Sequence, residues 1–126
     1  MLTPNLPETE ALLGMRIRNA RDAERAGVAL REMGAKAVLL KGGHGRGREA
    51  IDRWFDARGM LELRHPRLPG DYHGTGCTLS SALAAELARG ATPRTALRRA
   101  IAFVQRAMRH GFRTSPGGLV VLGVRP

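Results

Sequence analysis

Residues 73–88 read HGTGCTLSSALAAELA, and this stretch decides the fold class of the chain. The leucines at positions 79, 83 and 87 recur every four residues, which predicts a helix from about Gly76 to Ala88. Gly74 and Gly76 open that helix, and glycines let a backbone approach a ligand closely. Because a helix N-terminus offers free N–H groups and a partial positive charge, the stretch predicts an anion-binding loop. A tight turn that only feeds a packing helix is the alternative.

Cys77 lies in the first turn of this predicted helix and is the one cysteine of the chain. The field of a helix N-terminus favours the thiolate form, which would make Cys77 a reactive group. A lone cysteine is more often a buried and inert side chain, so that alternative stays open. A single cysteine cannot form a disulfide within the chain, and we therefore expect a reducing compartment, the cytoplasm.

A second candidate site follows the apolar run Ala37-Val38-Leu39-Leu40. So short and continuous a run predicts a strand that is buried on both faces, as in a parallel sheet. Lys41-Gly42-Gly43-His44 comes directly after it, where ligand crevices form in α/β sheets. Lys41 is thus a candidate phosphate contact, although a surface lysine in a turn would look the same. His44 and His73 lack further metal ligands around them, so no zinc site is predicted.

Asn5 and Glu8 place an amide and a carboxylate three residues apart near the N-terminus. Oxygen donors of this kind hold hydrated Mg²⁺ near phosphates. Capping of the next helix by Asn5 is the alternative interpretation.

The remaining pattern alternates helices with short apolar segments and predicts an α/β layer architecture. A helix is expected from Glu8 to Leu13, ended by Gly14. Two further helices begin at caps and carry apolar stripes: Asn19 with Ala23, Ala26, Leu30 and Met33, ended by Gly34, and Thr92 with Leu97, Ile101, Val104 and Met108. Strands are expected at 49–56 and 60–64 around a turn at Arg58-Gly59, then a loop at 66–70 and a last strand at 119–124.

The chain has 126 residues and a formal net charge of +10, carried almost entirely by arginine. The arginines are scattered and no basic run is interleaved with aromatics, which argues against a nucleic-acid partner. No apolar run approaches the roughly 20 residues of a membrane span. Met1-Leu2-Thr3-Pro4 lacks the charged and apolar regions of a signal peptide.

In this order, four segments carry a family resemblance: 2–8 (LTPNLPE), 10–14 (EALLG), 37–44 (AVLLKGGH) and 73–90 (HGTGCTLSSALAAELARG). The chain resembles, from Leu2 to about Gly111, the hydroxymethylpyrimidine and phosphomethylpyrimidine kinases of thiamine biosynthesis, in the ribokinase superfamily. Most of that superfamily has aspartate at the position of Cys77. Cysteine there is typical of the pyrimidine-kinase branch and also occurs in some pyridoxal kinases.

The resemblance implies the C-terminal half of a ribokinase-like three-layer α/β/α fold with a mostly parallel sheet. Residues 1–126 would form a partial domain, the ATP-binding half, and the N-terminal half that carries most of the acceptor pocket is expected to be absent. The segment 50–56 (AIDRWFD) departs from the aspartate-led strand usual there, and the tail after Gly111 matches no familiar ending. A free strand edge and an exposed apolar sheet face are expected where the other half would dock.

The resemblance also implies roles for single residues. Asn5 and Glu8 would organise Mg²⁺ and phosphate through water, and Asn5 and Lys41 would bind ATP. Gly74, Thr75 and Gly76 would form the anion hole. Cys77 would lie at the bound ATP and act as the catalytic base that accepts the proton of the substrate hydroxymethyl group.

The implied activity is ATP-dependent phosphorylation of a hydroxymethylpyrimidine or its monophosphate, with ATP and Mg²⁺ as cofactors. The expected partners are this small-molecule substrate and either a second copy of the chain or a complementing N-terminal half, with no nucleic acid and no membrane. A pyridoxal-type kinase and a non-catalytic nucleotide-binding remnant are the alternatives.

Overall fold

The computed structural model describes residues 1–43, 47–70, 72–116 and 118–123, so the predicted role of His44 lies outside the described residues. The chain divides into two compact units, Met1–Arg67 and Leu68–Pro126, each with its own helices and strands. No described helix is both long and apolar enough to span a membrane.

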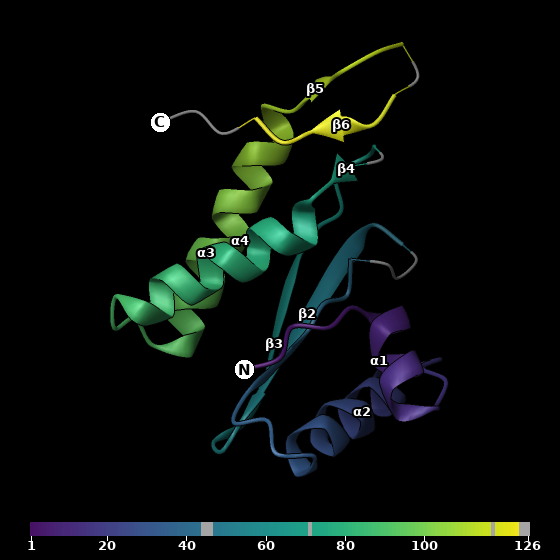
Figure 1. The fold of residues 1–126 in the computed structure, drawn as a ribbon, viewed down its shortest axis with the longest axis vertical. Helices are drawn as coiled ribbons and strands as arrows, with labels where there is room; N and C mark the ends of the chain where they lie inside the picture. The colour runs from purple at the N-terminus through teal and green to yellow at the C-terminus, as the bar shows by residue number, and fades with distance from the viewer. Residues whose placement is uncertain (44–46, 71, 117, 124–126) are drawn as a thin grey trace. The chain divides into compact units, whose positions relative to one another are not determined.

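The first unit packs two helices against a three-stranded sheet. Its elements are α1 (Leu6–Leu13), α2 (Ala20–Glu32), β1 (Val38–Leu40), β2 (Glu49–Asp56) and β3 (Gly59–Pro66) (Figure 1). The strand order is β1-β2-β3, and both pairs are antiparallel. Along the other edge of β1, the N-terminal segment forms two isolated parallel bridges, Leu2 with Val38 in the strand and Asn5 with Lys41 directly after it.

Helix α2 begins at its predicted cap, and α1 ends at its predicted glycine. The Asn19 side chain accepts the N–H of Asp22 at 2.9 Å, and Gly14 ends α1 in the left-handed region at φ 62°. α1 starts earlier than predicted, at Leu6, because Asn5 is its cap and proline is well suited to a first turn. The prediction of an apolar stripe on α2 was wrong at its last position. Met33 is the C-cap residue and is 67% exposed.

The core of the first unit lies between α2 and the sheet. Its buried members are Ala23, Leu30, Val38, Leu40 and Phe55. The Phe55 ring packs directly on the backbone of α2 at Gly27, and a Cβ built on Gly27 would lie 2.5 Å from the ring Cδ2. Gly27 is buried and helical, so its role is close approach of helix and ring rather than an unusual backbone angle.

Gly27→Ala is therefore expected to destabilise the protein even though alanine is the better helix former. The gain in helix propensity is about 1 kcal/mol, whereas forcing a methyl group into a packed core costs about 1–3 kcal/mol. A fall in the midpoint of urea unfolding measures the net loss. Arg25→Ala, at an exposed position of the same helix, is the control and should leave the midpoint unchanged. A rise in stability for Gly27→Ala would show that this packing is looser than described.

The second unit pairs two long helices with three short strands. Its elements are β4 (Tyr72–His73), α3 (Thr75–Ala88), α4 (Pro93–Arg109), β5 (Phe112–Arg113) and β6 (Val120–Val121). The helices α3 and α4 pack against each other (Figure 1), with Leu79 and Leu83 of α3 and Leu97, Ile101 and Val104 of α4 buried as predicted. Leu87 and Met108 are only half-buried.

The α/β class is confirmed, but the sheets are small and less parallel than expected. β1·β2, β2·β3 and β5·β6 are antiparallel, whereas β4·β6 and the two isolated bridges are the parallel pairings among the described residues. For β2 and β3 the reason is their short connection, because Asp56 pairs with Gly59 and only residues 57–58 lie between them. So short a connection joins antiparallel strands only.

Three strand boundaries also differ from the sequence prediction. β3 runs from Gly59 to Pro66, longer than 60–64 and at the expense of the predicted loop, so the turn lies at residues 57–58. The last strand is Val120–Val121 rather than 119–124, whose final residue is not described. β4 and β5 were missed because two-residue strands carry no readable periodicity.

Candidate active site

Asn5 and Glu8 form a capping box at the start of α1. The Asn5 side chain accepts the N–H of Glu8 at 2.8 Å, and Glu8 Oε2 accepts the N–H of Asn5 at 2.7 Å. The capping alternative for Asn5 is thus what the structure contains. The same bonds fix both side chains, while Glu8 is exposed and its Oε1 has no partner among the described residues.

Lys41 lies beside this capping box, on the neighbouring backbone segment. Its N–H donates to Pro4 O at 2.9 Å, within the parallel bridge that pairs Asn5 with Lys41. The fold therefore brings Lys41 beside Asn5 and Glu8, which are far from it in the sequence. Within the described parts of the chain, no carboxylate forms an ion pair with Lys41, so its charge is available to an anionic ligand.

Asp52 holds the backbone that follows Lys41, a role that the sequence analysis missed. Asp52 is 2% exposed, and its carboxylate accepts the Gly42 N–H through Oδ1 at 2.8 Å and contacts His65 Nε2 through Oδ2 at 2.9 Å. One sequence signal could have indicated this role, the alternation of side chains between the two faces of a strand. Asp52 shares one face of β2 with Ala50 and Trp54, both buried, and a carboxylate on a buried face needs partners.

The N-terminus of α3 carries the remaining predicted residues. Gly74 is the N-cap at φ 83°, in the left-handed region that glycine adopts readily, and as a glycine it has no side chain with which to cap the helix. The first helical bond runs from Thr78 N–H to Gly74 O at 2.9 Å. Among the described residues, the N–H groups of Thr75, Gly76 and Cys77 have no backbone acceptor, as is usual for the first turn of a helix.

Cys77 is exposed, so the expectation of a buried cysteine is wrong, while its reactivity stays a prediction. The next turn secures the helix behind it, because Ser80 Oγ donates to Gly76 O at 2.9 Å. The candidate residues thus form two sets: Asn5, Glu8 and Lys41 in the first unit, and residues 74–77 in the second.

Direct metal ligation does not fit these residues. Within residues 1–43, 47–70, 72–116 and 118–123, no three His, Cys, Asp or Glu side chains gather as a metal site. Asn5 Oδ1 and Glu8 Oε2 already accept N–H groups, and Glu8 keeps one oxygen free. The donor set fits a hydrated cation held through water, which is how Mg²⁺ commonly binds near phosphates.

Comparison with known proteins now decides the family. Residues 1–121 match the family model described as phosphomethylpyrimidine kinase. The chain belongs to this family.

Relatives of this kinase family are clearly similar in sequence. The hydroxymethylpyrimidine/phosphomethylpyrimidine kinase of Aquifex aeolicus is 35% identical over 118 residues, which cover 93% of this chain and 46% of the relative. The corresponding kinase of Streptomyces coelicolor is 42% identical over 111 residues, covering 87% of this chain and 41% of the relative. The chain therefore spans less than half the length of these kinases.

A solved kinase structure is similar across nearly the whole chain. The pyridoxal kinase of Staphylococcus aureus in complex with AMP-PCP and pyridoxal has a TM-score of 0.86 and 30% sequence identity. The match covers 96% of this chain and 46% of that one. The ribokinase-like α/β fold predicted from the sequence is thereby confirmed.

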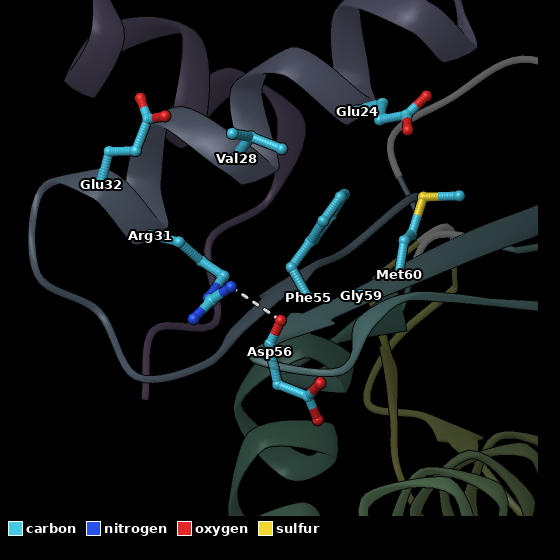
Figure 2. A pocket seen from close by; sticks show the side chains of 8 residues that line it. All are labelled: Glu24, Val28, Arg31, Glu32, Phe55, Asp56, Gly59 and Met60. Atoms are coloured by element: carbon cyan, nitrogen blue, oxygen red, sulfur yellow. Dashed lines mark hydrogen bonds between the residues drawn. The ribbon is translucent and has the colours of Figure 1, made fainter.

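One cavity in the first unit is separate from the candidate site residues. It has a volume of about 370 Å³ and lies between α2 and the β2–β3 hairpin. Figure 2 shows Phe55 directed toward α2, and Arg31 reaching the Asp56 carbonyl, to which it donates at 2.7 Å. No predicted site residue lines it.

Asp56 at the rim of this cavity has a lowered pKa. The Trp54 indole N–H donates to its carboxylate and lowers the pKa most. Burial acts in the opposite direction, and the Arg58 N–H and the charges of Arg58 and Arg31 lower it further. These partners therefore stabilise the fold at neutral pH, and their contribution is lost as the pH falls below the usual aspartate range.

Proposed function

We propose that this chain supplies the ATP-binding and phosphoryl-transfer half of a kinase for hydroxymethylpyrimidine or its monophosphate in thiamine biosynthesis. The observation that carries the proposal is the exposed Cys77 in the first turn of α3, inside a family match over residues 1–121. The kinase names of the relatives support the reaction class. The AMP-PCP complex of the structural neighbour supports ATP as the donor.

In the proposed reaction, Lys41 binds an ATP phosphate as a point charge. The open N–H groups of Thr75, Gly76 and Cys77 stabilise the migrating phosphoryl group, as fixed dipoles do for developing negative charge. The Cys77 thiolate accepts the proton of the acceptor hydroxyl, whose oxygen bonds to the γ-phosphorus while the bond to the ADP oxygen breaks. Catalysis thus rests on positioning and charge, as expected for phosphoryl transfer.

Mg²⁺ is proposed to bind through water at Asn5 and Glu8. When bound, it would neutralise phosphate charge. The capping box holds the two side chains in place for this, and Glu8 Oε1 is the oxygen best placed to accept from a coordinated water.

The acceptor pocket is proposed to come from outside these 126 residues, because the chain matches less than half of its relatives. Either a second copy or a complementing N-terminal half would provide it. Leu2, 42% exposed on the segment that borders β1, is one apolar side chain available to such a partner. We propose a cytoplasmic location, since a cysteine base must stay reduced.

A pyridoxal-type kinase is the second candidate, favoured by the structural similarity to pyridoxal kinase. An assay of ADP production with Mg·ATP and either hydroxymethylpyrimidine or pyridoxal separates the two, carried out on the chain together with the second copy or N-terminal half that supplies the acceptor pocket. We expect turnover with the pyrimidine at least about tenfold above that with pyridoxal, as for a site that loses hydrogen bonds to the wrong substrate. Turnover with pyridoxal alone would favour the second candidate, and turnover with neither acceptor in that assembly would favour a non-catalytic nucleotide-binding module.

A further inference from the structure

The Arg67 side chain donates hydrogen bonds to backbone carbonyl groups that precede and follow positions 44–46 in the sequence. Its Nε donates to Gly47 O at 3.1 Å, and its Nη2 donates to Gly42 O at 3.3 Å and Glu49 O at 3.2 Å. Its Nη1 donates to Gly43 O. One guanidinium therefore binds four carbonyl oxygens, and two of them belong to the residues directly after Lys41.

The backbone beside Lys41 is fixed from other directions as well. The Lys41 N–H donates to Pro4 O, and the Gly42 N–H donates to the buried Asp52 carboxylate. Gly42 also lies against β2 so closely that a Cβ built on it would be 2.7 Å from the carbonyl carbon of Ile51. The Lys41 backbone is thus held on one side by the N-terminal segment and on the other by Asp52 and Arg67.

Only arginine can make this set of bonds. A guanidinium carries five N–H donors in a rigid fork, whereas an ammonium offers three donors from a single point. The oxygens that converge on Arg67 are negative ends of dipoles next to a proposed phosphate site, and without a cation among them they would repel a phosphate. Because the N–H donors of Arg67 already bind carbonyl groups, this side chain is suited to hold the backbone in place rather than to bind ATP.

We infer that Arg67 is a positioning residue that, together with Asp52, holds the Lys41-Gly42-Gly43 backbone in the conformation that presents Lys41 to the phosphates of ATP. This inference rests on the proposed function, which assigns ATP phosphate binding to Lys41. Arg64, which lies on β3, is an arginine that makes no such backbone bonds among the described residues. It is 58% exposed and pairs with Glu62 and Glu49 through its side chain only.

The test is a titration of the full ¹⁵N-labelled chain with Mg·ATP, followed by NMR. In the wild type, the amide signals of residues 41–43 and of residues 74–77 should both shift. In Arg67→Met the shifts at 41–43 should be lost and the Kd should rise about tenfold, the effect of losing charged hydrogen bonds that hold a binding group. The shifts at 74–77 should remain at high ligand concentration. Arg64→Met removes the same charge and should bind within about twofold of the wild type.

Each other outcome has a distinct meaning. Wild-type affinity and shifts in Arg67→Met would overturn the inference. A folded Arg67→Met that loses both sets of shifts would also overturn it, because the effect would not be confined to Lys41. If Arg67→Met does not fold, Arg67→Lys, which keeps the charge but not the fork, is judged by the same two sets of shifts. A wild-type chain that gives no shifts would refute the proposed function itself, which is a different failure.

Discussion

Cys77→Ala is expected to abolish phosphoryl transfer while Mg·ATP still binds within about twofold of the wild-type affinity. The proposed role of the thiolate is to accept the acceptor's proton, and a positioned general base contributes about 10²–10⁴-fold to the rate. Alanine keeps the helix and its N–H groups, so the anion hole should persist. The measurement is the rate of ADP formation in any assembly that turns over the acceptor, together with an ATP titration of the same variant.

Two further variants sharpen this prediction. Cys77→Asp places a carboxylate where most of the superfamily has one, and it should restore part of the activity that alanine removes. Ser81→Ala changes an exposed side chain of the same helix and should leave turnover unchanged. Wild-type turnover by Cys77→Ala would remove Cys77 from the mechanism. The N-terminus of α3 would then be better explained as part of a non-catalytic nucleotide-binding module.

Gly42→Ala is expected to destabilise the first unit by about 3 kcal/mol, at the upper end of overpacking effects. The added Cβ would overlap the backbone of Ile51, whose carbonyl carbon and nitrogen would lie 2.7 and 2.9 Å away. A backbone cannot rotate aside as a side chain can, so either β2 or the Lys41 segment must move. The same shift should weaken binding of Mg·ATP. Urea unfolding and an ATP titration of the variant measure the two effects.

The neighbouring glycine provides a matched control. A Cβ built on Gly43 meets nothing within 4 Å among the described atoms, and Gly43 is not one of the glycines with positive φ. Gly43→Ala should therefore change the free energy of unfolding by no more than about 0.5 kcal/mol, as is usual for surface substitutions. Equal effects of the two substitutions would contradict the close packing of Gly42 on β2.

The long helices and their caps were predictable from the sequence because their signals are local. Asn19, Thr92 and the leucines of α3 act within a few residues of one another, and the structure places them as predicted. The residues of the phosphate-binding segments were also accessible, since glycines directly after a strand or before a helix are a local pattern. Their order along the chain then indicated the family.

The partners that hold those segments were not predictable, because their contacts join distant residues. Arg67 binds carbonyl groups of Gly42 and Gly43, and Asp52 binds the Gly42 N–H and His65. Nothing in the sequence near Arg67 distinguishes it from the many other arginines. The antiparallel pairing of β1 with β2 likewise depends on which strand lies beside the buried run, which its apolar composition does not specify.

We propose that residues 41–43 and residues 74–77 both respond to Mg·ATP. The most direct test is the response of these two segments to Mg·ATP in the wild-type ¹⁵N-labelled chain. We expect both segments to shift along a single binding curve with one Kd in the millimolar range. A curve for each segment with a different Kd, or no response of either segment at millimolar Mg·ATP, would contradict it.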